Sequence, residues 1–340
     1  MAPRAMILGC AGLELAAAER AFFDAADPWG FILFARNIES PDQVRRLVEA
    51  LRLTVGRPAP VFIDQEGGRV QRLRPPHWRA APPMGVFGRI HRTDPARARA
   101  GLALDCRLIA AELGALGISA DCVPCVDIPA ADEHGIIGDR ALSTDPEVAI
   151  ELGRIVLDAM MGAGILPVIK HLPGHGRARV DSHETLPVVE ASRAELEAVD
   201  FRPFAGLAHA PAAMTAHVVY TALDPAAPAT TSPVVIGEVI RGRIGFDGLL
   251  MSDDLCMKAL SGTPAERARA VFAAGCDIAL HCNGALDEME AIAAEAPALA
   301  GRALARATAA EAVTARSPAP FDVAEAGRTL AGLLAGEGRA

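Results

Sequence analysis

Short apolar segments alternate along this chain with longer segments whose apolar residues recur at helical spacing. Eight apolar segments occur, at 5–12, 30–37, 60–68, 118–128, 164–174, 212–220, 248–255 and 276–283. Near-continuous apolar strands separated by helices are typical of parallel strands covered by helices. Eight such units predict an α/β fold, the (β/α)₈ or TIM barrel, with a doubly wound open sheet as the structural alternative.

The expected helix starts carry a capping side chain before a proline in the first turn. They are Ser40-Pro41, Thr93-Asp94-Pro95, Thr144-Asp145-Pro146, Ser232-Pro233 and Thr263-Pro264. Ser192 with Glu195, and Thr263 with Glu266, also fit the capping box. No Pro/Ser-rich linker and no second set of strands interrupts the pattern. We therefore expect one domain over 1–340, with a barrel over about 5–283 and extra C-terminal covering helices over about 284–340.

The polar residues of the apolar segments collect at their C-terminal ends. They are Arg36, Asn37, Asp64, Gln65, Glu66, Asp127, Lys170, His171, His217, Asp253, Asp254, His281 and Asn283. Scattered buried polar groups would each cost kilocalories, and a barrel builds its active site at the C-terminal ends of its strands. These side chains therefore predict one pocket formed by several strands.

Some of these residues have simpler structural interpretations. Asp127 can cap a helix or brace a neighbouring arginine, and His217 and His281 fit hydrogen-bonded packing residues. Asp253 and Asp254 are adjacent on a strand, so alternation lets only one of them face the pocket. The other is expected in a structural salt bridge.

Composition narrows the class of protein. With 33 Lys and Arg against 42 Asp and Glu, the net charge of −9 argues against a nucleic-acid partner. The one basic run, Arg69–Arg79, is interpreted as a loop or a contact for an anionic ligand. No run reaches the roughly 18 apolar residues of a membrane span, so no membrane partner is expected. Nothing in the sequence specifies an oligomeric state.

The seven cysteines follow no disulfide framework, which favours reduced thiols and a cytoplasmic protein. Cys122 and Cys125 form a CxxC, but no second CxxC follows and Pro124 lies within an apolar run. We expect buried strand cysteines rather than a zinc or redox site.

Three histidines, His171, His175 and His183, lie close together in the segment ILPVIKHLPGHGRARVDSHE. His171 and His175 stand four apart, as in helical zinc motifs, but Leu172–Gly174 break a helix between them. A metal site formed on a folded loop stays an alternative, and we expect no metal and no cofactor. His175 receives no chemical role.

Asp181 and His183 stand two apart, so in an extended segment they point the same way. A carboxylate beside an imidazole fixes its tautomer and stabilises its protonated form, which suits a general acid/base near neutral pH. The spacing alone leaves open a surface pair without chemistry. Asp253 on the same rim adds a carboxylate that can act as nucleophile.

Five motifs in order resemble family 3 glycoside hydrolases, and more closely the single-domain bacterial β-N-acetylhexosaminidases of peptidoglycan recycling. They are DQEGGRVQRL at 64–73, IIGDRAL at 136–142, KHLPGHG…VDSHETLP at 170–187, MTAHVVY at 214–220 and SDDLCMKAL at 252–260. The resemblance implies hydrolysis that releases terminal N-acetylglucosamine from β-linked muropeptides with a 1,6-anhydro-muramic end, with retention at the anomeric carbon.

The resemblance also implies residue roles. Asp253 is the expected nucleophile, His183 the acid/base and Asp181 its orienting partner, a departure from the usual two carboxylates. Asp64, Arg72, Arg140, Lys170 and His171 match the family's sugar contacts. An arginine or lysine is expected to keep Asp253 ionised. Without a second domain to supply an acid, the segment from Gly174 to Thr185 is expected to close over substrate.

The chain departs from the family at several positions. Arg177 and Arg179 stand where acidic or small polar residues are frequent, Ala141 and Leu142 follow GDR, and Cys256 replaces a frequent serine. These departures affect substrate range rather than reaction class. A glycoside phosphorylase, with one of these arginines binding phosphate, is the enzymatic alternative. A silent sugar-binding barrel and a metal-dependent hydrolase are the others.

Overall fold

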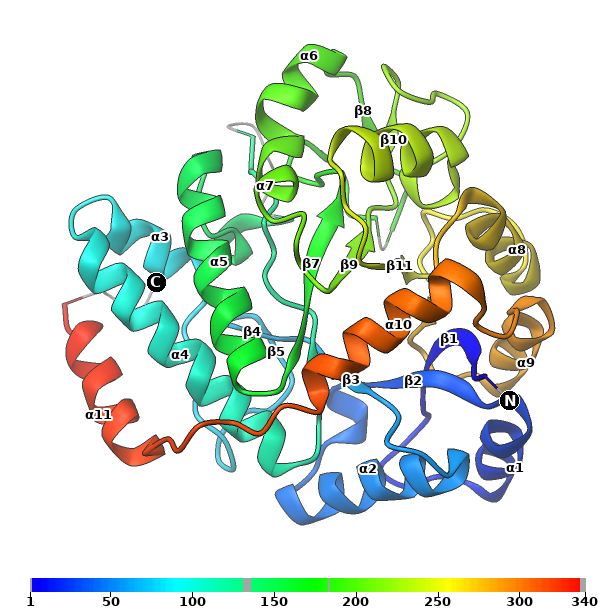
Figure 1. Cartoon of the computed structure of the whole chain (residues 1–340), viewed down its shortest axis with the longest axis horizontal. Coiled ribbons are helices and arrows are strands. Elements are labelled where there is room, and N and C mark those ends of the chain that lie inside the picture. The colour runs from blue at the N-terminus through cyan, green and yellow to red at the C-terminus, as the bar shows by residue number, and fades with distance from the viewer. Residues whose placement is uncertain (1, 131–135, 183, 337–340) are drawn as a thin grey trace.

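A closed barrel of parallel strands forms the centre of the molecule. The computed structural model describes residues 2–130, 136–182 and 184–336. Within these ranges the barrel order is β1-β12-β11-β9-β7-β6-β3-β2, which confirms the TIM barrel and excludes the open sheet (Figure 1). The strands are β1 (Arg4–Gly9), β2 (Pro28–Leu33), β3 (Val61–Ile63), β6 (Ala120–Asp121), β7 (Leu166–Leu172), β9 (Ala212–Thr215), β11 (Leu249–Asp254) and β12 (Ile278–His281).

Helices surround the barrel in chain order. They are α1 (Ala17–Ala26), α2 (Pro41–Val55), α3 (Gly85–His91), α4 (Pro95–Ala115), α5 (Pro146–Gly162), α6 (Arg193–Glu195), η3 (Leu196–Asp200), α7 (Phe201–Gly206), η5 (Val235–Arg243), α8 (Pro264–Ala274), α9 (Leu286–Glu295), α10 (Gly301–Thr314) and α11 (Val323–Leu333). Short 3₁₀ turns lie at η1 (Ala35–Asn37), η2 (Gly138–Arg140) and η4 (Ala229–Thr231). None of the helices in the described ranges is long and apolar enough to cross a membrane.

The predicted helix starts are confirmed by hydrogen bonds. The side chains of Ser40, Asp94 and Asp145 accept from backbone N–H groups in the first turns of α2, α4 and α5. Ser192 and Thr263 form complete capping boxes at α6 and α8. These caps satisfy N–H groups that have no partner inside the helix, so a local sequence signal suffices to place each start.

Strand residues alternate between the two sides of the barrel wall. Ile7 belongs to a buried cluster inside the barrel, whereas its neighbours Met6 and Leu8 pack between strands and helices. This alternation follows from the two-residue period of a strand. Successive residues of each strand therefore face the barrel interior and the surrounding helices in turn. Because both faces are buried, the segments are apolar nearly throughout.

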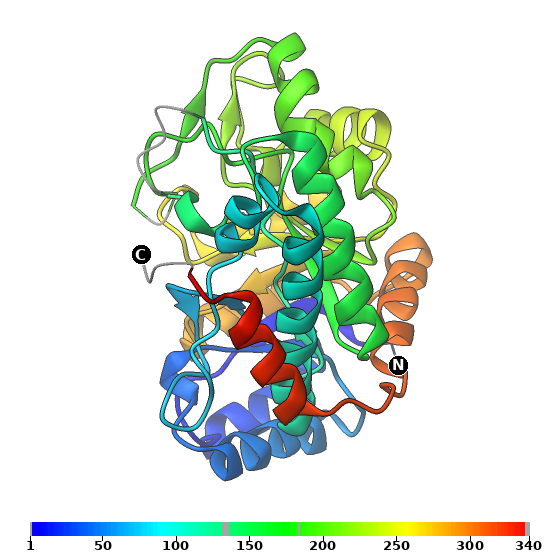
Figure 2. The same cartoon turned by 90° about the vertical axis from the view of Figure 1, so that its left-hand side faces the viewer.

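The C-terminal helices cover the barrel as predicted. Helix α10 contributes Ala307, Ala310 and Val313 to the interior cluster, so it closes the N-terminal end of the barrel. The indole of Trp29 donates to Glu311 Oε1 on α10 at 2.6 Å. Helix α11 packs along α4 on the outside (Figure 2).

Three predicted strands are shorter than expected. The segment 60–68 divides into β3 and β4 (Gln65–Gly67), and β4 pairs in a hairpin with β5 (Val70–Gln71) just beyond the segment. The segment 212–220 divides into β9 and β10 (Val219–Tyr220), which pairs with β8 (Val188–Val189). Only Ala120–Asp121 of 118–128 forms a regular strand. In each case the barrel strand ends where the polar residues of the segment begin. The segments that follow these strand ends form the rim of the pocket.

Candidate active site

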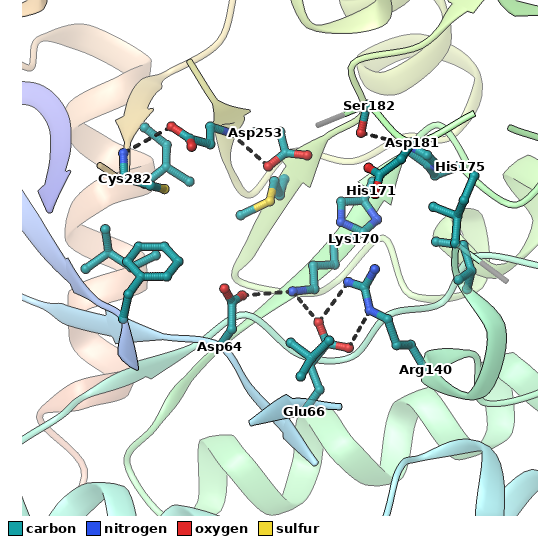
Figure 3. A pocket seen from close by; sticks show the side chains of 18 of the residues that line it. Asp64, Glu66, Arg140, Lys170, His171, His175, Asp181, Ser182, Asp253 and Cys282 are labelled. Carbon is teal, nitrogen blue, oxygen red and sulfur yellow. Dashed lines mark hydrogen bonds and ion pairs between the residues drawn. The ribbon is translucent and has the colours of Figure 1, made fainter. Parts of the chain in front are cut away.

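A cavity lies at the C-terminal ends of the strands, where the sequence predicted a pocket. Its walls include seven of the eight residues assigned a role from the sequence: Asp64, Arg72, Arg140, Lys170, His171, Asp181 and Asp253. Figure 3 shows the charged side chains converging on it from separate elements. The eighth, His183, lies outside the described residues.

A chain of ion pairs forms one wall of the cavity (Figure 3). Lys170 Nζ lies 3.1 Å from Asp64 Oδ1 and 2.7 Å from Glu66 Oε1. Arg140 then holds Glu66 through two hydrogen bonds, of 2.9 Å from Nε and 2.8 Å from Nη2. A bidentate arginine fixes the plane of the carboxylate as well as its charge. The wall therefore presents rigidly placed charged groups to the cavity.

These contacts shift the pKa values of the paired groups. Burial opposes ionisation of Glu66, but the charges of Lys170 and Arg140 outweigh it and lower the pKa of Glu66 to about 2. The pKa of Asp64 is lowered in the same way, against burial, by Lys170 and Arg72. Lys170 and Arg140, although buried, have raised pKa values because of the carboxylates beside them. All four groups are therefore charged near neutral pH.

The basic run at Arg69–Arg79 pairs with carboxylates of the protein itself. Arg72 Nη2 lies 2.9 Å from Asp64 Oδ2, and Arg79 Nη1 lies 2.5 Å from Asp105 Oδ1. Arg69 contacts Asp139 at 3.4 Å. These pairs bring the hairpin and the segments around it together, in agreement with the loop interpretation of the run. Arg69 and Arg72 also line the cavity, and a contact of the run with an anionic ligand stays a prediction.

Asp127 has neither of its two predicted roles. It caps no helix and pairs with no arginine among the described residues. Its Oδ2 lies 2.7 Å from His171 Nδ1, and its Oδ1 accepts from the backbone N–H of His175 at 2.6 Å. These contacts outweigh burial and lower the pKa of Asp127. Asp127 thus orients His171, whose partner could be identified only after folding.

His175, which received no role from the sequence, packs against the segment that carries Asp181. Its side chain is buried, and Nε2 lies 3.3 Å from Ser182 Oγ, next to Asp181. Burial, together with the nearby His171 ring, lowers the pKa of His175 to about 4. It is therefore neutral near pH 7, and it connects the start of the 174–185 segment with the part that carries Asp181.

Asp253 and Asp254 both line the cavity, so the prediction that only one of them does is wrong. The pairing of β11 with β12 shifts register between Met251 and Asp254, and this shift breaks the strict alternation. Asp254 also makes no salt bridge among the described residues. Its Oδ1 accepts the backbone N–H groups of Cys256 and Cys282, each at 3.0 Å.

The packing interpretation of His217 is confirmed, and Cys122 and Cys125 are buried as expected. His217 is buried between Thr230 Oγ1 at 2.8 Å and the Asp254 carbonyl at 3.0 Å. Cys122 and Cys125 are free and buried. Burial raises the pKa of both thiols well above its usual range, so they carry no thiolate chemistry near neutral pH.

Two buried carboxylates near the site received no individual role from the sequence. Glu66 stands in the quoted DQEGG motif at a strand end, so its position was a usable signal for the ion-pair chain. Asp121 closes β6 and accepts the Gln65 N–H at 2.9 Å. Burial raises the pKa of Asp121 to about 8, against the lowering effect of that N–H group. An aspartate inside an apolar strand was the available signal for it.

Comparison with known families decides the class of this chain. Residues 14–314 match the glycosyl hydrolase family 3 N-terminal domain. The chain belongs to glycosyl hydrolase family 3. The resemblance stated from the motifs is thereby confirmed, and the protein is an enzyme, a glycoside hydrolase.

Individual members of the family agree with this assignment. A beta-hexosaminidase from Alkalilimnicola ehrlichii is 42% identical over 283 residues, which cover 82% of this chain and 80% of that protein. The native NagZ structure from Neisseria gonorrhoeae superposes with a TM-score of 0.86 at 30% identity, covering 98% of both chains. The same NagZ in complex with N-trifluoroacetyl-D-glucosamine gives a TM-score of 0.86 at 31% identity, covering 98% of this chain and 99% of that chain.

Proposed function

We propose that this family 3 hydrolase is a retaining exo-β-N-acetylglucosaminidase. Its proposed substrate is a peptidoglycan fragment in which terminal N-acetylglucosamine is β-linked to a 1,6-anhydro-muramic residue. Asp253 is the proposed nucleophile, His183 the general acid/base and Asp181 the residue that orients His183. We place the reaction in the cytoplasm, in keeping with seven cysteines that are all free.

The observation that carries the proposal is the meeting of Asp253 with Asp181 and the ion-pair wall in one cavity. Asp253 arrives on β11, and Asp181 arrives on the segment that follows β7. A carboxylate nucleophile and a separate acid/base must face one sugar from two directions. The sugar type comes from the relatives, which are named beta-hexosaminidases, and from the NagZ complex with an N-acylated glucosamine.

In the proposed mechanism, Asp253 attacks the anomeric carbon and forms a glycosyl-enzyme while the bond to the leaving oxygen breaks. His183 gives its proton to that oxygen, then takes a proton from the water that hydrolyses the intermediate. Asp181 fixes the imidazole tautomer and stabilises its protonated form. Two successive inversions at one carbon give retention. The role of His183 rests on its motif.

The ion-pair wall is proposed to bind the sugar hydroxyls through hydrogen bonds. Lys170, Asp64 and Arg140 are already paired, so they need no rearrangement to accept and donate hydrogen bonds. His171, whose Nδ1 is held by Asp127, can offer Nε2 to a hydroxyl. Groups ordered in advance lose little entropy on binding. We assign Asp64, Arg72, Arg140, Lys170 and His171 to substrate binding on this basis.

The Arg177 contact supports hydrolysis over phosphorolysis. Arg177 Nε lies 2.7 Å from Asp200 Oδ2, and Asp200 is buried. An arginine that already compensates a buried carboxylate is a poor receptor for incoming phosphate, because releasing it leaves that charge unpaired. Arg177 is therefore a poor candidate for the phosphate-binding arginine, and we propose water as the acceptor of the glycosyl group.

The test is turnover of 4-nitrophenyl N-acetyl-β-D-glucosaminide and of defined muropeptides. We expect release of N-acetylglucosamine as the β-anomer first, seen by proton NMR, with no sugar phosphate when phosphate is added and no effect of a chelator. Asp253→Asn should lose nearly all turnover. Asp247→Asn is the matched control, since Asp247 is an exposed aspartate paired with Arg306. Full activity in Asp253→Asn, or an α-anomer product, would overturn the proposal.

A further inference from the structure

A cysteine, a histidine and a glutamate meet just outside the active-site cavity. Cys256 follows β11, His281 ends β12 and Glu288 lies in the first turn of α9. One potential ligand atom from each, a sulfur, a ring nitrogen and a carboxylate oxygen, lies within 4.8 Å of the other two. We propose that these three side chains bind a thiophilic divalent metal ion such as Zn²⁺.

The distances suit a tetrahedral ion. Zinc bonds of about 2.0 Å to nitrogen or oxygen and about 2.3 Å to sulfur place the atoms of one sulfur and two nitrogen or oxygen ligands roughly 3.3 to 3.5 Å apart. His281 Nε2 and Glu288 Oε2 are 3.0 Å apart, close to one such edge. Three protein ligands leave one coordination position open to water. The bound ion should therefore exchange and be removable by a chelator.

The surroundings of the three residues are already arranged. The Asp254 carboxylate accepts the Cys256 N–H and the Cys282 N–H, so it fixes the end of β11 against the end of β12. Asn283 Nδ2 donates to Glu288 Oε2 at 2.8 Å, which orients this carboxylate. Groups that hold metal ligands in place commonly matter for affinity nearly as much as the ligands themselves.

The histidine contacts only the glutamate through its ring nitrogens among the described residues. Its side chain is 1% exposed, Nε2 lies 3.0 Å from Glu288 Oε2, and Nδ1 has no hydrogen-bond partner in those ranges. Within the same described ranges, no lysine or arginine makes an ion pair with Glu288. A cation bound between Nε2 and Oε2 would replace the hydrogen bond that joins them, and no lysine or arginine would have to leave. Glu288 is 35% exposed and Cys256 is half-buried, so an ion can enter from solvent.

The site is distinct from the substrate cavity. Leu280 and Cys282 line that cavity, and His281 lies between them on the strand, so its ring points to the opposite side of the barrel wall. None of the three proposed ligands lines the cavity. The sulfur ligand from Cys256 favours zinc or copper over magnesium or calcium.

Binding of the metal ion should release one proton from the protein. The Cys256 thiol releases its proton to solvent as the sulfur–metal bond forms, while His281 binds through a neutral ring nitrogen. No oxidant or reductant is required. The proposal is independent of the proposed glycosidase mechanism, because no step of that mechanism uses the metal.

The test uses the full chain, stripped of metal and titrated with Co²⁺, which reports sulfur ligation through a near-ultraviolet charge-transfer band. We expect this band to saturate at one equivalent and to be removed by Zn²⁺. Cys256→Ser should lose the band and one equivalent of bound cobalt. Its circular dichroism spectrum should not change, because Cys256 is half-buried.

Cys125→Ser is the matched control. Cys125, Asp127 and His171 form the other cysteine-containing group within 4.8 Å among the described residues, so this variant should keep the band. Glu288→Gln should keep the band but weaken binding by roughly 10 to 100-fold. No band in the wild type, a band that survives Cys256→Ser, or an unchanged affinity in Glu288→Gln would overturn the proposal.

Discussion

Lys170 Nζ lies 2.7 Å from Glu66 Oε1, and each of these side chains is only 3% exposed. The two residues are 104 positions apart in the chain, from 66 to 170. Their pairing brings the hairpin after β3 onto the end of β7. It therefore joins two segments that both contribute walls to the active site.

The first prediction concerns Glu66→Gln. Removing one partner of a buried ion pair strongly lowers the free energy of unfolding, because the remaining charges stay buried without compensation. Lys170 and Arg140 would lose their shared carboxylate, and we expect a loss of about 3 kcal/mol in the free energy of unfolding. Chemical denaturation measures it. Glu147→Gln, which removes an exposed pair with Arg202, should cost less than about 1 kcal/mol. Equal losses would contradict the burial argument.

Asp121 gives a prediction about pH. Its pKa in the folded state, about 8, lies above the ordinary value of 3.8. A raised pKa contributes stability that is complete below about pH 4 and is lost as the pH rises towards 8. The slope reaches about 1.4 kcal/mol per pH unit.

Asp121→Asn should remove this dependence, because asparagine stays neutral and can still accept the Gln65 N–H. We expect the variant and the wild type to be similarly stable at low pH, with the variant increasingly more stable as the pH rises towards 8. Thermal unfolding midpoints across this range measure the difference. Parallel pH profiles would show that Asp121 does not titrate in this window.

The third prediction separates acid catalysis from nucleophilic attack. His183→Ala should lower kcat/KM for muropeptides by about 10² to 10⁴-fold, because their leaving oxygen needs a proton. The loss should be much smaller for the 4-nitrophenyl glycoside, whose leaving group departs unprotonated. Asp181→Asn should show the same asymmetry to a smaller extent. Glu184→Gln, an exposed neighbour in the same segment, serves as the control. An equal loss with both substrates would refute the acid role.

A fourth prediction uses two glycines. A Cβ on Gly176 would lie 1.9 Å from the carbonyl oxygen of Ile128, so Gly176→Ala must displace the segment that leads to Asp181. We expect lower activity and lower stability. Gly327 lies inside α11 with nothing within 4 Å of its Cβ position. Gly327→Ala should therefore stabilise the protein by about 0.5 to 1 kcal/mol, with activity unchanged. Unfolding midpoints and turnover of both variants check this contrast.

Much of the candidate site could be predicted because it lies at strand ends. Asp64, Lys170 and Asp253 each follow an apolar run, and the barrel rule places such residues on one rim. Glu66 shared that position, but only its contact with Lys170 distinguishes it from a solvated carboxylate. Asp127 was assigned to a helix or an arginine because its partner, His171, becomes a neighbour only when the β6 and β7 segments pair.

The sequence by itself determined the barrel, the helix starts and the family. Periodicity and capping act over a few residues, and the family motifs are read in order along the chain. Only the tertiary structure decided which charges pair, how a register shift places Asp254 beside Asp253 at the cavity, and that Cys256, His281 and Glu288 meet. These contacts join residues from separate βα units. Their geometry depends on how the strands align when the barrel closes, which no local pattern specifies.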